Sequence, residues 1–325
     1  MTKAPRILIH ADRTSADRIA AQLTAHLPGI ELAISDSYEG LGAAIETFHP
    51  NVVYSTVFSR KAYPRDDLFA ERRLEWVHAS GAGINHLVPW DAHRVTVTNA
   101  GGIQDEGMAQ FAFARLFAIN CNFFAYHDQQ KQHVWADHDN LNSVGGTLTV
   151  VGLGKIGRAC ARLGAKLGMT VYGVRARPEP CEGVAEVVPP ERMNHVLAKS
   201  DYVIVVTPLT DATRGLIGPE QFAAMKPGTI FHNMARGRVV DDSAMAAALT
   251  SGHLRAASVD VFEEEPLPAS SPLWDTPNLH VTPHIGGMLT YAEYDRLSTQ
   301  VFLDNLDRWR AGEPLDNVCD PVRGY

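Results

Sequence analysis

Three short stretches of the sequence hold an arginine, a carboxylate and a histidine. Arg236 lies in 233–237, Glu265 in 260–266 and His284 in 282–287. A guanidinium binds planar oxygen pairs in a two-pronged geometry, and a histidine can give or take a proton near neutral pH. A carboxylate beside that histidine orients the imidazole and stabilises its cation. These residue types therefore predict proton transfer at a carbonyl oxygen that lies next to a carboxylate.

A glycine fingerprint precedes these stretches in the chain. Gly152, Gly154 and Gly157 follow the apolar run 147–152 and open a helical run. In this context the first glycine permits a tight turn, the second lets the backbone approach a pyrophosphate, and the third packs helix against strand. The pattern predicts a dinucleotide site that also includes Lys155 and Ile156.

The end of the following strand indicates which nucleotide is preferred. Enzymes that use NAD usually place an acid there to bind the ribose 2′-hydroxyl, but this chain has Arg175 and Arg177. A guanidinium can bind a 2′-phosphate through charge-assisted hydrogen bonds. We therefore expect NADP(H) as the preferred cofactor, with NAD(H) as the alternative. In the other interpretation these arginines are solvated loop charges, partly offset by Glu179 and Glu182.

Short apolar runs alternate with amphipathic helical runs along the whole chain, which predicts an α/β fold with parallel sheets. Strands of a first sheet are expected at 6–11, 51–55, 74–79 and 95–99. Those of a second sheet are expected at 147–152, 169–174, 202–207, 229–233, 257–260 and 279–282. One long helix is expected at about 105–130 and another at about 291–310.

Five motifs in one order resemble those of the D-isomer-specific 2-hydroxyacid dehydrogenases. They are the glycine fingerprint and the stretches 208–213, 233–237, 260–266 and 282–287. The resemblance implies two doubly wound parallel-sheet domains. A Rossmann cofactor domain, 101–288, would be inserted in a flavodoxin-like substrate domain made of 1–100 and 289–325.

The resemblance also implies roles for individual residues. Arg236, Glu265 and His284 would form the catalytic triad. Backbone amides of a loop would bind the substrate together with Arg236 and His284; the loop residues are Ser80, Gly81, Ala82 and Gly83. Asp260 would bind the nicotinamide carboxamide, unless it is only a strand-end cap. Further cofactor contacts are expected from Thr207, Pro208, Ala235 and Gly286.

The expected activity is NADPH-dependent reduction of small 2-oxo acids, of the glyoxylate or hydroxypyruvate type, to D-2-hydroxy acids, with His284 as the general acid. This reduction should slow at high pH as His284 loses its proton. Substrate selection is expected from Phe58, Arg60, Ile84 and Met288. Phe58 equally suits an aromatic acid such as phenylpyruvate. In a different class of function, the chain would be a nucleotide-sensing protein like the corepressor relatives of the family.

Composition bounds these hypotheses. The net charge of −8 and a pI near 5.9 argue against nucleic acid as a partner, and no apolar run has the length of a membrane span. The four cysteines lack metal-ligand spacing, so we expect reduced thiols in a cytoplasmic protein. No metal site is expected, although His127, His133 and His138 share one polar stretch. The resemblance implies a homodimer, in which Trp135 could cover an active site.

Overall fold

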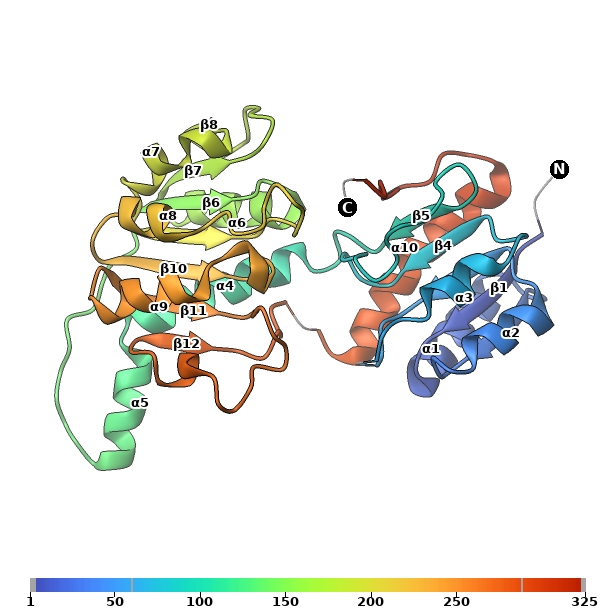
Figure 1. Ribbon diagram of the computed structural model, residues 1–325, viewed down its shortest axis with the longest axis horizontal. Coiled ribbons are helices and arrows are strands. Elements are labelled where there is room, and N and C mark those ends of the chain that lie inside the picture. The colour runs from blue at the N-terminus through green and yellow to red at the C-terminus, as the bar shows by residue number, and fades with distance from the viewer. Residues whose placement is uncertain (1–3, 60, 288, 323–325) are drawn as a thin grey trace. The chain divides into compact units, whose positions relative to one another are not determined.

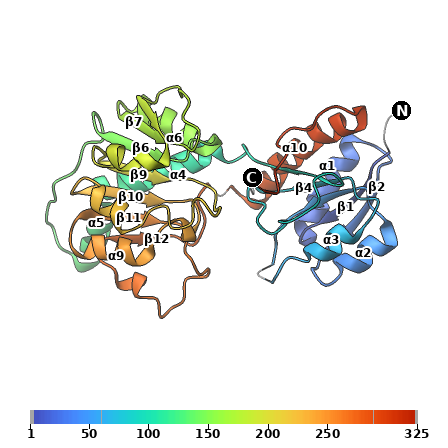
Figure 2. The ribbon, with the colours of Figure 1, turned by 45° about the horizontal axis from the view of Figure 1, so that its top comes forward.

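The computed structural model describes residues 4–59, 61–287 and 289–322. The chain forms two compact units. The terminal unit consists of Met1–Ile103 and Leu289–Tyr325, and the central unit consists of Gln104–Met288. Each unit has its own parallel sheet (Figures 1 and 2).

The sheet of the terminal unit has the strand order β2-β1-β3-β4-β5. All four pairings are parallel, and the 2-1-3-4-5 order is that of the flavodoxin-like doubly wound fold. The strands are β1 (Arg6–His10), β2 (Glu31–Ser35), β3 (Val52–Ser55), β4 (Trp76–Ala79) and β5 (Thr96–Asn99).

Helices cover both faces of this sheet. One apolar cluster joins it to α2 and α3, and a second cluster on the other face joins it to α1 and α10. The bounds are α1 (Arg13–His26), α2 (Leu41–Phe48), α3 (Arg65–Ala70) and α10 (Tyr291–Ala311). Although α10 is the last helix of the chain, its Phe302 ring stacks on Trp76 of β4 at a centroid distance of 4.7 Å. The last helix of the chain therefore packs in the same apolar core as the strands near the start of the chain.

The sheet of the central unit has the order β12-β11-β10-β9-β6-β7-β8. With β6 counted as the first strand, this is the Rossmann order 3-2-1-4-5-6 with one more strand beyond the sixth. The strands are β6 (Thr147–Val151), β7 (Thr170–Val174), β8 (Glu186–Val188), β9 (Tyr202–Val205), β10 (Thr229–Asn233), β11 (Leu254–Val259) and β12 (Leu279–Val281). The fold class predicted from the sequence is confirmed.

Helices also lie on both faces of the central sheet. The helices α4 (Asp105–Asn120) and α6 (Lys155–Lys166) share one apolar cluster. On the other face lie α7 (Met193–Leu197), α8 (Pro219–Ala224) and α9 (Asp242–Thr250). Short 3₁₀ turns are formed by Pro190–Arg192, Gly237–Val239 and Pro272–Asp275.

The prediction of one long helix over 105–130 is wrong. The structure has α4, which ends at Asn120, and a separate α5 (Phe123–Gln132). Between them Asn122 adopts a left-handed conformation with φ 49°, which asparagine tolerates better than most residues. Its side-chain amide donates to the carbonyl of Asp139 and to Oδ1 of Asn140. The break thus ties the start of α5 to the polar segment that follows this helix.

Two strands were not predicted, β2 and β8. Each is the outermost strand on one side of its sheet, and β8 has only three residues. Short, half-exposed edge strands carry little apolar signal, which explains the omission.

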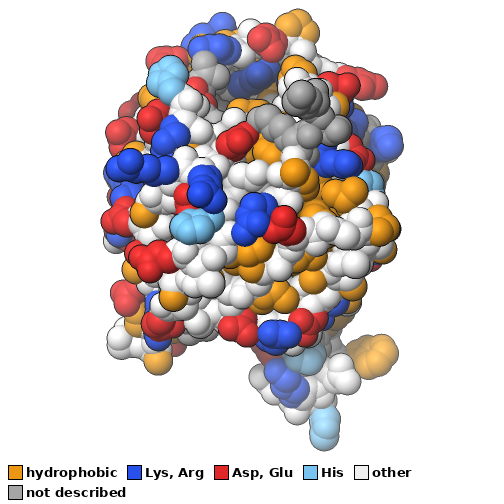
Figure 3. Space-filling model, turned by 90° about the vertical axis from the view of Figure 1, so that its right-hand side faces the viewer, with side chains coloured by type: hydrophobic (Ala, Val, Ile, Leu, Met, Phe, Trp, Pro, Cys, Tyr) orange, Lys and Arg blue, Asp and Glu red, His pale blue; other side chains and the backbone are white. Residues whose placement is uncertain are grey.

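The described surface mixes charges of both signs. On the face shown in Figure 3, basic and acidic side chains are interspersed. Within the described ranges, no helix is long and apolar enough to cross a membrane. Over the same ranges, no group of three or more His, Cys, Asp or Glu residues is arranged to hold a metal ion.

The left-handed conformation of Asn122 gives a test of the helix break. We expect Asn122→Ala to lower the free energy of unfolding by about 1–2 kcal/mol. The left-handed backbone conformation is less favourable for alanine than for asparagine, and the variant loses both side-chain hydrogen bonds. Asn122→Gly should lose less, because glycine adopts this conformation freely. Asn140→Ala is the control, since it removes only one exposed hydrogen-bond partner, and its effect should stay within about 0.5 kcal/mol. Urea unfolding measures all three; an Asn122→Ala protein as stable as the wild type would contradict the assignment.

Candidate active site

Three loops that leave neighbouring strands of the central sheet hold the predicted triad. Arg236 follows β10, Glu265 lies in the loop after β11, and His284 follows β12. These strands are adjacent in the order β12-β11-β10 and run parallel. Their carboxyl ends therefore meet at one edge, where sites of open α/β sheets form.

Glu265 and His284 are in direct contact. The Nδ1 of His284 lies 2.7 Å from Oε2 of Glu265, and the other carboxylate oxygen accepts from the backbone N–H of Phe262 at 2.9 Å. Because an ionised carboxylate only accepts hydrogen bonds, Nδ1 carries the proton and donates it. The Nε2 of the ring is then the nitrogen turned away from the carboxylate. The His284 side chain is 46% exposed, so solvent or a ligand can reach it.

The pKa of Glu265 lies below its ordinary value of 4.5. Burial acts to raise this pKa, but four interactions together outweigh it: the hydrogen bonds from His284 and from the Phe262 N–H, and the charges of His284 and Arg236. The carboxylate is therefore ionised over the whole neutral pH range, as stabilisation of an imidazolium requires.

Arg236 is held close to the same carboxylate. Its Nη1 donates to the carbonyl of Ala235 at 2.6 Å. Burial lowers the pKa of its guanidinium, and the charge of Glu265 opposes that shift. The next residue, Gly237, packs against the loop that carries Glu265: a Cβ here would lie 1.9 Å from the carbonyl carbon of Phe262. Only a glycine lets the Arg236 turn approach the Glu265 loop this closely.

Asp260 holds the turn that carries His284. One oxygen of its carboxylate accepts from the Thr282 hydroxyl at 2.6 Å and from the Ile285 N–H at 2.9 Å, and the other accepts from the Gly286 N–H at 2.8 Å. His284 itself has a positive φ of 55°, a conformation that the surrounding structure must stabilise. These hydrogen bonds give Asp260 a structural role; its expected contact with the nicotinamide stays a prediction.

The fingerprint residues form the cradle that a pyrophosphate would need. Gly152 has φ 103°, and a Cβ on Gly157 would lie 1.8 Å from the carbonyl oxygen of Gly152. A Cβ on Gly154 would have no atom within 4 Å, so the chain is open at this position. Gly154 caps α6 without a side chain, and the start of a helix favours an anion through its backbone N–H groups and dipole. The residues present therefore fit a dinucleotide.

Thr207 and Pro208 follow β9, whose neighbour in the sheet is β6. A Cβ on Gly152 would lie 3.0 Å from the Thr207 backbone nitrogen, so these two predicted cofactor segments adjoin. Ala235 follows β10 at the same edge. Arg175 comes directly after β7, and its Nη1 donates to Oε2 of Glu179 at 2.8 Å. Arg177 is exposed.

The predicted substrate loop belongs to the terminal unit, where it follows β4. The carbonyl groups of this loop accept hydrogen bonds from residues of the same unit. The carbonyl of Ser80 accepts from the hydroxyls of Tyr294 and Ser298. The carbonyl of Gly81 accepts from the Ala100 N–H, and the carbonyl of Ala82 accepts from the Asn99 side chain. The C=O and N–H of a trans peptide point in opposite directions. The N–H groups of Gly81, Ala82 and Gly83 are therefore turned away from these partners.

The expected specificity residues divide into three cases. Arg60 and Met288 lie outside the described residues. Ile84 is fully buried in the apolar cluster beneath α2 and α3, so its prediction as a pocket residue is wrong; its place in a loop hid its core position. Phe58 packs edge-on against His10 at 5.0 Å and Tyr38 at 4.9 Å between ring centroids.

His10 was missed by the sequence analysis. It ends β1 and is fully buried, and burial lowers its pKa to about 4 although its hydrogen bond to the Ser35 carbonyl opposes this. Its Nδ1 lies 3.1 Å from the Ser35 carbonyl and must donate to it, whereas its buried Nε2 has no partner among the described residues. The sequence feature that could have drawn attention to His10 is a histidine near the end of the strand expected at 6–11.

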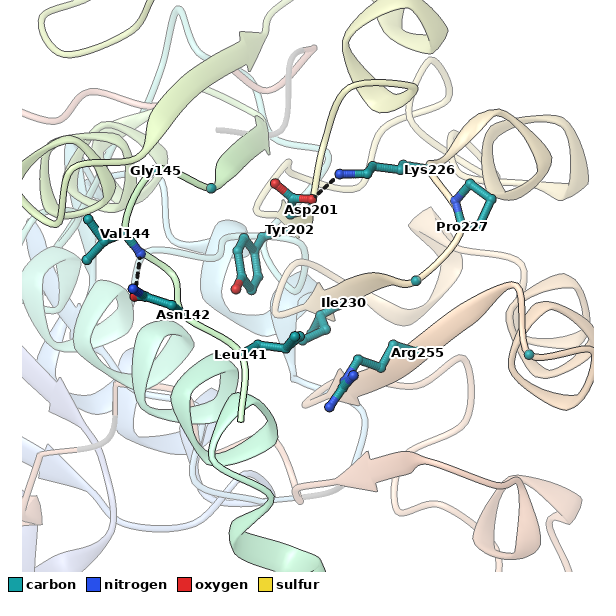
Figure 4. Close-up of a pocket in the computed structure, with 13 residues that line it drawn as sticks. Leu141, Asn142, Val144, Gly145, Asp201, Tyr202, Lys226, Pro227, Ile230 and Arg255 are labelled. Atoms are coloured by element: carbon teal, nitrogen blue, oxygen red, sulfur yellow. Dashed lines mark hydrogen bonds and ion pairs between the residues drawn. The ribbon is translucent and has the colours of Figure 1, made fainter. Parts of the chain in front are cut away.

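A cavity of about 640 Å³ lies at the opposite edge of the central sheet, near the amino ends of its strands (Figure 4). Tyr202, Ile230 and Arg255 line it, together with the ion pair between Lys226 and Asp201. None of the described site residues predicted from the sequence belongs to its lining. Trp135, in the polar segment after α5, is fully exposed; that it covers an active site stays a prediction.

Comparisons with known proteins agree on one family. Residues 113–286 match the model of the D-isomer specific 2-hydroxyacid dehydrogenase, NAD binding domain. A D-3-phosphoglycerate dehydrogenase of Mycobacterium bovis is 35% identical over 238 residues, which are 72% of this chain and 45% of that protein. The match spans about half the length of that relative and of several others, whereas a protein of Corynebacterium melassecola, 28% identical, is matched over 84% of its length.

Solved structures resemble the chain over nearly its full length. A D-isomer specific 2-hydroxyacid dehydrogenase from Xanthobacter autotrophicus Py2, in complex with NADPH and MES, has a TM-score of 0.85 and 31% identity and covers 99% of this chain and 100% of its own. An NADPH-dependent glyoxylate/hydroxypyruvate reductase from Sinorhizobium meliloti, in complex with NADP and sulfate, has a TM-score of 0.81 and 26% identity, with 98% and 99% covered. The chain belongs to the D-isomer specific 2-hydroxyacid dehydrogenase family.

Proposed function

We propose that this protein is an NADPH-dependent reductase of small 2-oxo acids, of the glyoxylate and hydroxypyruvate type, which forms D-2-hydroxy acids. The contact between His284 and Glu265 carries the proposal. It combines a proton donor with a permanent carboxylate partner, next to the Arg236 guanidinium and on the sheet edge that also holds the glycine cradle. The family membership and the chemistry of the edge support the same reaction.

Each residue of the triad has one task in this reaction. Arg236 binds one carboxylate oxygen and the carbonyl oxygen of the acid, because its planar fork matches two oxygens at once. It also stabilises the charge that develops on the carbonyl oxygen. His284 donates the Nε2 proton to that oxygen, and Glu265 stabilises the imidazolium from the Nδ1 side. Reduced nicotinamide, when bound, supplies the hydride to C2 of the acid.

The cofactor preference rests on Arg175 and Arg177. Neither position has the acid that would repel a 2′-phosphate, and both follow the strand next to the fingerprint. The two structural relatives described above were solved with NADPH and with NADP. These observations support NADP(H) over NAD(H) for this chain as well. Gly152, Gly154 and Gly157 would hold the pyrophosphate at the start of α6.

The substrate class is inferred from the loop of the terminal unit. Outward N–H groups on Gly81, Ala82 and Gly83 suit a carboxylate, and the name of the Sinorhizobium relative supports glyoxylate and hydroxypyruvate. A homodimer is part of the proposal by family resemblance. Reduction of aromatic acids such as phenylpyruvate is the alternative, which the half-buried Phe58 ring favours.

A panel assay tests this proposal. We expect kcat/KM with NADPH to be highest for glyoxylate and hydroxypyruvate, lower for pyruvate and lowest for phenylpyruvate, and to fall when NADH replaces NADPH. Preference for phenylpyruvate would keep the chemistry but overturn the substrate class. Tight NADPH binding without turnover of any 2-oxo acid would instead support a nucleotide-sensing protein.

His284→Ala tests the proton donor. We expect kcat for reduction to fall by roughly 10²- to 10⁴-fold, which is the usual contribution of a positioned acid, while the dissociation constant of NADPH changes little. His253→Ala is the control, because this imidazole binds the Met225 carbonyl at 3.0 Å near the amino end of β11. An unchanged reduction rate in His284→Ala would remove the residue from the mechanism.

The lowered pKa of Glu265 predicts how stability depends on pH. A carboxyl with a depressed pKa in the folded state stabilises the fold above its unfolded value of 4.5, and this contribution is lost as the pH falls through the lowered pKa. We therefore expect wild type to exceed Glu265→Gln in free energy of unfolding at pH 6, and the difference to shrink towards pH 3. Urea unfolding at several pH values measures it. A difference that is constant between pH 6 and pH 3 would show that the carboxylate is not stabilised by its partners.

A further inference from the structure

The ion pair between Arg175 and Glu179 lies where, in the proposed function, the 2′-phosphate of NADP(H) would bind. Arg175 is the first residue after β7, and its backbone N–H donates to the Val188 carbonyl at 3.0 Å. This hydrogen bond anchors the residue at the carboxyl edge of the sheet. Its guanidinium is directed to Glu179, with 2.8 Å between Nη1 and Oε2. Both side chains are reachable by a ligand, with exposed fractions of 33% and 61%.

A carboxylate and a phosphate make the same kind of contact with a guanidinium. Both accept charge-assisted hydrogen bonds from its planar N–H groups. Glu179 therefore takes donors that a 2′-phosphate needs, and its negative charge also repels the phosphate. The ribose of NADH carries a hydroxyl in that place, so its binding requires no exchange of partners at Arg175.

We propose that Glu179 competes with the 2′-phosphate for Arg175 and thereby limits the preference of this protein for NADPH over NADH. The inference rests on the proposed function, because it assumes that Arg175 binds this phosphate. Glu179 is then a specificity-determining residue for the cofactor. Binding of NADPH must break the ion pair and bring the phosphate beside a displaced carboxylate, whereas binding of NADH leaves the pair in place.

The size of the effect follows from the charges involved. A phosphate monoester carries about −1.5 to −2 charges at pH 7, and exposed charges a few ångströms apart interact weakly in water. We expect Glu179→Gln to tighten NADPH binding by roughly 3- to 10-fold at low salt, and to change NADH binding by less than about 2-fold. The gain should shrink as salt screens the charges.

Asp128→Asn is the matched control within the same unit. Asp128 pairs with Lys131 at 3.1 Å and is 65% exposed, so this variant also removes one negative charge from an exposed ion pair. The residue lies on α5, whose Phe124 stacks on His280 of β12. The strand order places β12 and β7 far apart in the sheet, and Figures 1 and 2 show α5 well away from β7. A general effect of net charge would appear in both variants.

The experiment measures dissociation constants of the full chain by isothermal titration calorimetry, with NADPH, NADH and adenosine 2′,5′-bisphosphate as ligands. The proteins are wild type, Glu179→Gln, Asp128→Asn, Arg175→Ala and the double variant Arg175→Ala with Glu179→Gln. The expected result is tighter binding of NADPH and of the bisphosphate in Glu179→Gln alone. In the Arg175→Ala background, Glu179→Gln should have a smaller effect, because the shared partner is gone.

The contrary outcomes separate the inference from the proposed function. If Arg175→Ala weakens NADPH but Glu179→Gln does not tighten it, or tightens NADH equally, the competition is overturned and the cofactor assignment stands. If Asp128→Asn tightens NADPH as much as Glu179→Gln does, the effect is general electrostatics and the inference also fails. If Arg175→Ala leaves the ratio of NADPH to NADH affinity unchanged, the proposed cofactor preference fails together with the inference.

Discussion

The geometry of this site depends on the hydrogen bonds that the carboxylate of Asp260 accepts. His284 lies in a left-handed conformation that costs free energy, and the three hydrogen bonds from Thr282, Ile285 and Gly286 to Asp260 offset that cost. Asp260 is itself fixed, since its backbone N–H donates to the Asn233 carbonyl at the end of β10. The imidazole is therefore positioned by a carboxylate at the end of the neighbouring strand, and the hydrogen bonds of the sheet hold that carboxylate in place.

Close backbone packing connects the rest of the triad to this framework. Gly237 brings the Arg236 turn against the backbone of Phe262, and the Phe262 N–H in turn donates to Glu265. The arginine and the glutamate thus belong to loops that contact each other through main-chain atoms, and the histidine turn is joined to them through the carboxylates of Asp260 and Glu265. Main-chain contacts are less tolerant of displacement than contacts between long side chains, which explains why glycine is needed at a position that has no chemical role.

The sequence predicted the parts of the fold that rest on strong local patterns. Buried parallel strands are nearly continuous apolar runs, and the glycine fingerprint has a fixed relation to strand and helix, so β6, α6 and the triad loops could all be placed. The break at Asn122 could not be placed, because it depends on side-chain bonds to Asp139 and Asn140, which are distant in sequence. The edge strands β2 and β8 lack the apolar signal. Ile84 and His10 were misjudged or missed because burial is decided by tertiary packing, which a residue's neighbours in the chain do not reveal.

The proposed ligands are anions, although the chain carries a net charge of −8. Basic and acidic side chains are interspersed on the face shown in Figure 3, and the proposed function relies on oriented backbone groups instead of a broad basic surface. Backbone N–H groups, at the start of α6 and in the loop from Ser80 to Gly83, provide oriented dipoles that carry no net charge. In the proposed function, full positive charges are then needed at two points: Arg236 would lie beside the reacting oxygens and Arg175 beside the ribose. Each of these guanidiniums has a glutamate nearby: Arg175 forms an ion pair with Glu179, and the charge of Glu265 acts on Arg236. Glu265 is fixed by its hydrogen bonds with His284 and the Phe262 N–H, whereas the exposed Glu179 is paired with Arg175 alone among the described residues. In the proposed function the fixed glutamate would support proton transfer, and the exposed one would be open to exchange with a ligand.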